Sequence, residues 1–509
     1  MGDFLRMCRI FGVVSDQEVD EENLFRASRC MLSGGPDQQW VKHGKNWSIG
    51  ANRLAIQGID GGKQPFQLNN LICVFNGEIY NHRALRELLV CQGYAFSDFC
   101  DGNIILPLYQ EFGKDFLTRL EGMFAIAILE LDAEGKCVSA FLASDQSAMK
   151  TLFYRVDETG LYFASSLKAL NEITPNPFSI RDGFVYEYVS RKAVWGPDTV
   201  YEGVNVLGSG ETLSYSATSG GHRLGTYQHE FAPLQIDGLD QTSEQLDALL
   251  HQEIASMADV DVNICSVLSG GLDSSYITSI VKKYTDKLDA FHISYDHHWP
   301  GDESHYARMV AQAHNVKLEH IKVDVAQLPN YVAEYIRHLD QPNYAPHCLS
   351  TYCLFKEIGN SGYKVAFTGE GADELFCGYD RLIRAATDTD ENWFEKFFAI
   401  YGISPFRNGS YFKKGYLENL CETNYAPPIE PAPNRSRMQS VLRYDSKSRF
   451  PYYILRRVDS LSMASSVEVR MPFLQPRVID FARKLPDEYL YSSGVGKQCV
   501  LRAGKKYLP

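Results

Sequence analysis

The sequence has too little positive charge for a protein that binds nucleic acid or acidic membranes through a broad surface. Its 509 residues include 63 acidic and 50 basic side chains, giving a formal net charge of −13. Attraction to phosphate backbones or acidic lipids needs an excess of positive charge. We therefore expect no nucleic-acid and no membrane partner, although a local basic pocket for a nucleotide is compatible with this charge.

Long apolar runs and paired cysteines are also missing. No run approaches the roughly 20 residues of a membrane-spanning helix. The opening residues MGDFLRMCRIFGVV lack the apolar core of a signal peptide. The twelve cysteines include no C-x-x-C pair, which is typical of reduced thiols rather than of disulfides or zinc ligands. Together these absences predict a cytoplasmic protein.

The pattern of short apolar segments divides the chain into two halves. From Cys8 to about Tyr215, strand-like runs alternate with turns and a few helical patterns, which predicts an α+β layered domain. From Val262 onward strands and helices alternate, which predicts an α/β domain with a doubly wound parallel sheet. A Gly-, Ser- and Thr-rich stretch places the linker at 216–240, so the expected domains are 1–215 and 241–509. In the second half we expect strands at 262–268, 288–295, 318–323 and 364–368, and helices at 276–284, 303–314, 332–339 and 351–358.

The segment SGGLDSS at 269–275 lies between an expected strand and an expected helix, as a phosphate-binding loop does. Its two glycines let the backbone approach an anion, and a helix start offers unpaired N–H groups. Asp273 adds a carboxylate, which suits phosphates when a cation such as Mg²⁺ lies between them. The loop is not a Walker A motif, since no G-x-x-x-x-G-K-[ST] occurs in the chain. An ordinary strand–helix turn is the alternative interpretation.

A second loop, GEGADELFCGY at 369–379, follows the strand expected at 364–368. Its density of acidic residues and glycines is unsuitable for a core strand. Because parallel strands deliver their following loops to one edge of the sheet, both loops are expected to face one ligand. Asp373 and Asp273 form the best pair for Mg²⁺ that bridges ATP phosphates. A solvated acidic loop is the alternative.

Several blocks resemble glutamine-hydrolysing asparagine synthetase, a family that joins a class II glutamine amidotransferase domain to an ATP-pyrophosphatase domain. The SGGLDS and GEGADE loops resemble the nucleotide loops of that second domain, and 458–474 resembles the helical tail of the family. In the first half the matching blocks are Met7–Gly12, Gly35–Asp37, Asn52–Leu54, Gln64-Pro65, the distinctive NGEIYN at 76–81, Asp101 and Glu121–Ala125. The resemblance implies an αββα, Ntn-hydrolase-like domain, followed by an ATP-pyrophosphatase domain with a helical carboxy-terminal part.

The resemblance assigns roles to residues of the first half. Cys8 is the nucleophile that attacks the glutamine carboxamide, with its own α-amine as the base, and Asn76 and Gly77 stabilise the oxyanion. Arg53 binds the α-carboxylate of glutamine. The implied glutamine-binding set is Arg53, Asn76, Gly77, Glu78 and Asp101. A buried strand cysteine is the alternative interpretation of Cys8.

In the second half the resemblance makes Glu370 a catalytic residue. β-Lactam synthetases carry Tyr at that position, so the acid favours the amide-forming branch of the superfamily. Asp273 and Asp373 are the implied Mg²⁺ ligands. The implied ATP-binding residues are Leu268, Ser269, Gly270, Gly271, Asp273, Ser274, Ile293, Thr368 and Gly369.

The sequence departs from the family pattern at a few places. Seven residues precede Cys8, so its nitrogen is an amide as written. The free α-amine requires translation to start at Met7, with removal of that methionine, or cleavage of a short leader; otherwise the enzyme depends on free ammonia. The family also places a lysine that neutralises pyrophosphate shortly beyond the position of Pro509. Either the chain continues past Pro509 and supplies this lysine, or activity is compromised. Gly34, Ser460 and Gln475 replace other characteristic residues.

We interpret the chain as a glutamine-dependent amidotransferase that uses ATP and Mg²⁺. A carboxylate, aspartate or a related acid, is adenylated with release of pyrophosphate, and ammonia from glutamine then crosses an internal passage and displaces AMP. The alternatives are an intramolecular cyclase of the β-lactam synthetase or lasso-peptide type, a PP-loop tRNA-modifying protein, and a catalytically degenerate partner protein. A homodimer is the assembly that we consider.

Overall fold

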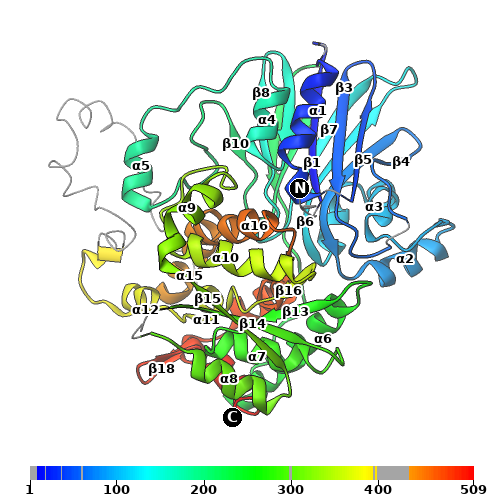
Figure 1. Ribbon diagram of the computed structural model, residues 1–509. Coiled ribbons are helices and arrows are strands. Elements are labelled where there is room, and N and C mark those ends of the chain that lie inside the picture. Colours follow the sequence, from blue (N-terminus) through cyan, green and yellow to red (C-terminus); the bar gives the residue numbers. More distant parts are fainter. Residues whose placement is uncertain are drawn as a thin grey trace.

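The computed structural model (Figure 1) describes residues 8–17, 19–35, 37–58, 61–296, 301–393, 396–397 and 435–509. Met7 and Pro36, which belong to two of the family-like blocks, lie outside these residues. In Figure 1 the first half of the chain is at the top in blue and cyan, and the second half lies below it in green to red.

Two six-stranded antiparallel sheets form the first half, in the orders β10-β8-β9-β1-β3-β2 and β12-β11-β7-β6-β5-β4. The strands of the first sheet are β1 (Arg9–Ser15), β2 (Gln38–His43), β3 (Trp47–Arg53), β8 (Phe153–Asp157), β9 (Gly160–Ala164) and β10 (Asn205–Val206). Those of the second are β4 (Phe66–Leu68), β5 (Leu71–Ile79), β6 (Gly122–Leu131), β7 (Cys137–Ser144), β11 (Glu211–Ser216) and β12 (His222–Thr226).

Alternation along these strands fills apolar layers on both faces of each sheet, because successive residues point to opposite sides. In β1, Ile10 lies in the core between the two sheets, whereas Phe11 packs with residues of the covering helices. The first sheet is covered by α1 (Glu21–Cys30) and α4 (Leu167–Ile173), and the second by α2 (His82–Cys91) and α3 (Ile105–Phe112). The predicted layered α+β fold, with helices outside two stacked sheets, is confirmed.

Five parallel strands form the sheet of the second half, in the order β15-β14-β13-β16-β17. They are β13 (Ile264–Val267), β14 (Asp289–Tyr295), β15 (Lys317–Val323), β16 (Val365–Phe367) and β17 (Glu468–Arg470). The chain runs from β13 outward to β14 and β15, and returns to β16 on the other side of β13. The carboxyl ends of β13 and β16 therefore flank a topological switch point, where ligands bind in open α/β sheets. The predicted parallel-sheet domain is confirmed.

The helices of the second half surround this sheet and then form a helical carboxy-terminal part (Figure 1). They are α6 (Leu239–Ala258), α7 (Leu272–Val281), α8 (Ser304–Ala313), α9 (Leu328–Ile336), α10 (His347–Asn360), α11 (Ala372–Phe376), α12 (Asp380–Thr387), α15 (Arg437–Lys447), α16 (Arg456–Met463), α17 (Pro476–Lys484), α18 (Asp487–Leu490) and α19 (Gln498–Gly504). A π-helical turn (Phe450–Leu455) precedes α16, and a hairpin of β18 (Tyr491–Ser492) and β19 (Val495–Gly496) precedes α19.

Several elements differ from the sequence-based expectations, and one of them is α10, which begins at His347 rather than at 351. α7 begins at Leu272 rather than at 276, so the end of the SGGLDSS segment is helical. α9 begins four residues earlier than expected, with Pro329 in its first turn. Proline is tolerated there because the N–H groups of the first turn have no carbonyl partner within the helix. β17 lies within the segment that resembles a helical tail.

The two halves are joined by buried polar contacts as well as by apolar packing. Asp459 of α16 accepts from Arg9 at 3.0 Å and lies 3.4 Å from the Lys150 ammonium, and all three side chains are buried. One apolar cluster contains residues of α1, α4, α10 and α16. The relative position of the two sheets is therefore fixed by a packed interface rather than by a single linker.

Among the described helices, none combines the length and the apolar character that crossing a bilayer requires. The segment 216–240 contains β12, which pairs with β11, and leads into α6. The domain bounds 1–215 and 241–509 stay a prediction.

Candidate active sites

The predicted glutaminase residues converge at one end of the two stacked sheets. Cys8 immediately precedes β1, Arg53 ends β3, and Asn76, Gly77 and Glu78 lie in β5. Asp101 begins a short 3-10 helix (Asp101–Ile104) beside β5, and its Oδ2 accepts from the Ile79 N–H at 2.8 Å. The Ser165 hydroxyl joins the two sheets here, because it accepts from the Ile10 N–H at 3.0 Å and from Asn76 Nδ2 at 3.4 Å.

Burial disfavours ionisation of the Cys8 thiol. Its Sγ donates weakly to the Leu54 carbonyl at 3.7 Å. Burial raises the pKa of Cys8 to about 12, and nearby Glu78 and Asp101 add to this effect while Arg53 opposes it. Because the thiolate is the nucleophile, attack from this site needs a base that removes the proton as the reaction proceeds.

Glu78 and Asp101 form a buried carboxylate pair beside Cys8. Burial raises the pKa of both carboxyls, and for Glu78 repulsion by Asp101 is the next cause. The nearest cation to Glu78 is the fully buried Arg470 of β17, whose Nη2 lies 3.5 Å from Oε2. A desolvated pair of this kind favours the arrival of a second cation, such as the ammonium of an amino acid.

Arg53 is already well supplied with acceptors. Its guanidinium donates to the carbonyls of Gln57 at 3.0 Å, Gly58 at 2.9 Å and Gly61 at 2.6 Å. These bonds tie Gln57, Gly58 and Gly61 to the end of β3. Binding a substrate carboxylate would require some of these carbonyls to be exchanged, so that role for Arg53 stays a prediction.

The two acidic loops of the second half line one cavity of about 360 Å³ at the switch point. The loops touch closely, since a Cβ on Gly369 would lie 2.8 Å from backbone atoms of Asp273 and Ser274. Eight predicted residues line the cavity: Ser269, Gly271, Asp273, Ser274, Thr368, Gly369, Glu370 and Asp373. Leu268, Gly270 and Ile293 are not among its lining residues; Leu268 is buried at the end of β13 and Ile293 lies in β14.

Hydrogen bonds within the first loop fix its shape. The Ser269 N–H donates to Ser274 Oγ at 3.1 Å, and the Gly271 N–H donates to Ser269 Oγ at 3.2 Å. Asp273 lies in the first turn of α7, where the positive end of the helix dipole faces the cavity. The loop therefore presents hydroxyls, N–H groups and one carboxylate to the space above the sheet.

A lysine that the sequence did not point to lies between the two acidic loops. Lys497 Nζ is 2.7 Å from Asp273 Oδ2 and 2.7 Å from Asp373 Oδ1. Burial raises the pKa of Asp273 to about 6, and the Lys497 charge opposes the increase. Asp273 Oδ1 is buried and has no hydrogen-bond partner among the described residues.

A basic wall completes the lining of this cavity. His347, Arg449, Tyr453, Ile454 and Arg457 line it, and none of them belonged to the predicted site. Arg457 is only 9% exposed, and its Nε has no partner in the described parts of the chain. A buried guanidinium that faces a cavity is suited to an anionic ligand.

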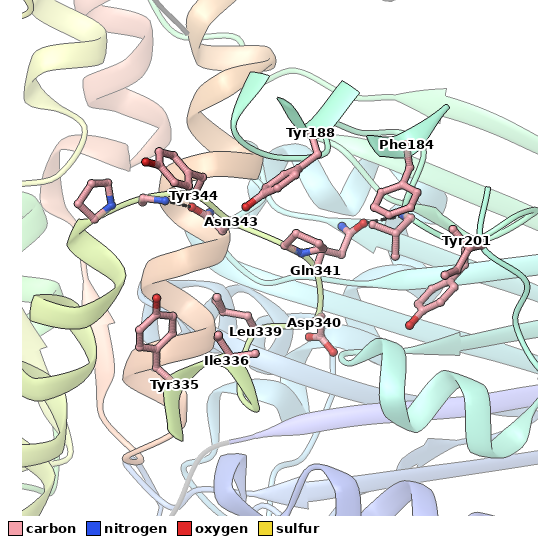
Figure 2. A pocket seen from close by; sticks show the side chains of 15 residues that line it. Phe184, Tyr188, Tyr201, Tyr335, Ile336, Leu339, Asp340, Gln341, Asn343 and Tyr344 are labelled. Carbon is pink, nitrogen blue, oxygen red and sulfur yellow. Dashed lines mark hydrogen bonds between the residues drawn. The ribbon is translucent and has the colours of Figure 1, made fainter. Parts of the chain in front are cut away.

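A larger cleft of about 710 Å³ lies beside the nucleotide cavity (Figure 2). Figure 2 shows Phe184, Tyr188 and Tyr201 on one side and Tyr335 and Leu339 on the other. The two spaces adjoin along the chain, because Pro346 lines the cleft and the next residue lines the cavity. The lining is mostly aromatic and aliphatic, and its acid, Asp340, is engaged by the Ser166 hydroxyl at 2.8 Å.

Comparison with known proteins decides the family. Residues 245–509 match the asparagine synthase family model, and residues 7–228 match the glutamine amidotransferase domain model. The chain belongs to the asparagine synthase family. Asparagine synthetase [glutamine-hydrolyzing] 1 of Bacillus subtilis is 27% identical, over 99% of this chain and 85% of that protein. Asparagine synthetase B of Escherichia coli is 26% identical, over 99% of this chain and 80% of that protein.

Membership of this family confirms the resemblance drawn from the motifs. Its two domains make the chain a carbon–nitrogen ligase, and they support the predicted amidation of a carboxylate with ATP and glutamine. The roles of the individual site residues are not decided by family membership and stay predictions.

Proposed function

We propose that the nucleotide cavity adenylates an acidic acceptor and passes it to ammonia. An acceptor carboxylate oxygen attacks the α-phosphate of ATP, forming an acyl-adenylate and releasing pyrophosphate. Ammonia then attacks the acyl carbon, AMP leaves, and an amide remains. The observation that carries this proposal is the convergence of Asp273, Asp373 and Glu370 in one cavity at the switch point, which the buried Arg457 also lines.

Magnesium fits the donors present in this cavity. The described residues contain no cluster of three or more His, Cys, Asp or Glu side chains that would hold a metal alone. The carboxylates of Asp273 and Asp373 offer two oxygen ligands, and the unpartnered Oδ1 of Asp273 is a further acceptor. Mg²⁺ commonly takes one or two carboxylates and completes its shell with phosphates and water. When bound there, it would neutralise charge on the phosphates and the departing pyrophosphate.

The first half supplies the ammonia. The Cys8 sulfur attacks the glutamine carboxamide, ammonia leaves, and water hydrolyses the resulting thioester to glutamate. The proposal requires cleavage of the Met7–Cys8 bond, because the free α-amine is then the base; an unperturbed α-amine has a pKa of about 7.7–8.0. Intact-mass measurement of the purified natural protein tests this step. A protein that keeps Met1–Met7 and also releases no glutamate would contradict it.

Ammonia is proposed to reach the adenylate through the interface between the halves. Arg470 supports this route, because its side chain approaches Glu78 while its carbonyl accepts from the Thr368 N–H at 3.0 Å. One buried residue thus joins the glutaminase pocket to the strand end that carries the nucleotide loop. A closed route protects the adenylate from water and ammonia from protonation.

The acceptor that we propose is aspartate or a related acid with a second anionic group. The basic wall of Arg449, Arg457 and His347 supports such an acid. The decisive experiment incubates the protein with ATP, glutamine and a panel of mono- and dicarboxylic acids, and follows pyrophosphate and glutamate. We expect acid-dependent release of the two products in equal amounts. Failure of every acid to elicit pyrophosphate, even with ammonium salts, would favour the degenerate partner protein.

A further inference from the structure

Lys497 is held against the second acidic loop by its own backbone. It follows the β18–β19 hairpin and precedes α19, in the left-handed region at φ 54°, ψ 37°. Its N–H donates to the Phe376 carbonyl at 3.1 Å. The lysine and Asp373 therefore belong to one locally packed unit, whereas Asp273 comes from the first turn of α7.

The ammonium of Lys497 bridges these two units. Its Nζ lies at the same distance, 2.7 Å, from an oxygen of Asp273 and an oxygen of Asp373. The lysine side chain is 16% exposed, so solvent screens these contacts only in part. In the part of the chain that the structure describes, no other basic side chain forms an ion pair with either carboxylate. Lys497 is thus the counter-ion that allows the two acids to face each other.

The space around the pair is shaped for this contact. A Cβ on Gly378 would lie 1.7 Å from Asp373 Oδ1 and 2.9 Å from Lys497 Cδ. Any side chain at 378 would therefore push the carboxylate and the lysine out of their positions. The glycine leaves the room that the bridge requires.

The bridge and a bound divalent cation exclude each other. Mg²⁺ binds carboxylate oxygens at about 2.0–2.1 Å, and the Lys497 nitrogen already occupies the space between the same two side chains. A free ion that displaced the lysine would leave a largely desolvated ammonium without its two acceptors, which is unfavourable. A metal ion that arrives bound to ATP avoids this cost, because the phosphate oxygens accept hydrogen bonds from the displaced ammonium.

We propose that Lys497 is a built-in counter-ion that occupies the cation position of the nucleotide-free enzyme, excludes free divalent ions, and releases that position when metal and nucleotide arrive together. The inference rests on the proposed metal–ATP site. It makes metal and nucleotide binding mutually dependent, since each supplies what the other needs to displace the lysine.

Binding of Mn²⁺ to the full chain, followed by electron paramagnetic resonance of the free ion, tests the proposal. Without nucleotide, Lys497→Met should bind Mn²⁺ at least about tenfold more tightly than the unaltered protein, because a positive charge leaves the site. Lys505→Met, which removes an exposed lysine beyond α19, should leave the affinity unchanged. Adding Asp373→Asn to Lys497→Met should abolish the gain.

A second comparison needs no variant. The unaltered protein should bind Mn²⁺ at least about tenfold more tightly with a non-hydrolysable ATP analogue than without it. Equal Mn²⁺ affinity of the unaltered protein and Lys497→Met, or equal affinity of the unaltered protein with and without the analogue, overturns the role of Lys497. If the analogue binds but recruits no Mn²⁺ even in Lys497→Met, the metal–ATP site itself is refuted. Circular dichroism identifies a variant that fails to fold, and the second comparison then decides.

Discussion

The two pockets each contain a pair of carboxylates, but they treat the pair differently. Glu78 and Asp101 are buried, whereas the Asp373 side chain is 27% exposed. In the glutaminase pocket, Glu78 has Arg470 only at 3.5 Å, and Asp101 forms no ion pair among the described residues. In the nucleotide pocket, Lys497 lies 2.7 Å from both Asp273 and Asp373. The negative charge of Glu78 and Asp101 is therefore only partly neutralised, whereas Asp273 and Asp373 are neutralised by the ammonium of Lys497.

This difference matches the ligand that each pocket is proposed to receive. Free glutamine brings its own ammonium, so an incompletely neutralised pair gains an ion partner on binding. ATP brings negative charge, so the second pair must hold a cation both before and after the ligand arrives. In each pocket, the arrangement of charged side chains therefore suits the charge of the proposed substrate.

The largest effect is expected from Cys8→Ala, which separates the two pockets. Without the nucleophile, glutamate release should fall by about 10³-fold or more. Pyrophosphate release with ammonium salts and the acceptor should persist, because the nucleotide cavity is untouched. Glutamate and pyrophosphate assays on the same preparation measure both. Cys91→Ala, at an exposed position in α2, is the control and should change neither rate.

Asp373→Asn is expected to break the second pocket alone. Loss of one charged ligand, worth roughly 1.5–3 kcal/mol, should lower pyrophosphate release about 10- to 100-fold with either nitrogen source. Glutamate release in the absence of acceptor should stay within about twofold. The matched control is Asp380→Asn, an exposed acid at the start of α12. A parallel loss of glutaminase activity would show that the two pockets are not independent.

The sequence predicted the loops that carry Asp273 and Asp373 because local patterns define them: a strand, glycines and a helix start. No local pattern pointed to Lys497. It follows a short hairpin, and the residue that it contacts, Asp273, lies 224 positions earlier in the chain. Arg457 was missed for the same reason, because only the packed helices place it above the cavity. Such partners depend on tertiary structure, so a sequence without aligned relatives cannot identify them.

β17 is a strand that the sequence pattern did not predict. Its residues Glu468 and Arg470 are buried, although β17 is the edge strand of the sheet, and charged residues contradict the apolar pattern expected of a buried strand. The two charges compensate each other, with Arg470 Nε 2.9 Å from Glu468 Oε1. The layered first half and the parallel sheet were predictable because most of their strands follow ordinary apolar patterns.

Arg457→Met tests whether the nucleotide pocket recognises an acceptor with a second negative charge. If the basic wall binds the second anionic group of the acceptor, its KM for the acceptor should rise about tenfold or more. The KM for ATP should change much less, because Arg457 belongs to α16 and not to the two loops that are proposed to hold ATP. Arg384→Met, at an exposed position in α12, is the control. Equal increases in both KM values would place Arg457 on the nucleotide instead.

The smallest effect concerns another acid that lines the nucleotide pocket, Glu374, which forms no salt bridge with Lys497. Burial raises its pKa to about 8, above that of Asp273, and its carboxyl accepts from Tyr379 at 2.9 Å. A folded-state pKa above the ordinary 4.5 means that the neutral form is stabilised by the fold. That contribution is complete below pH 4.5 and is lost as pH rises through 8. Glu374→Gln should therefore raise the melting temperature by about 2–4 °C at pH 9 and by much less at pH 6. Calorimetry at both pH values measures this, and an equal shift at the two would show that the side chain acts through packing rather than charge.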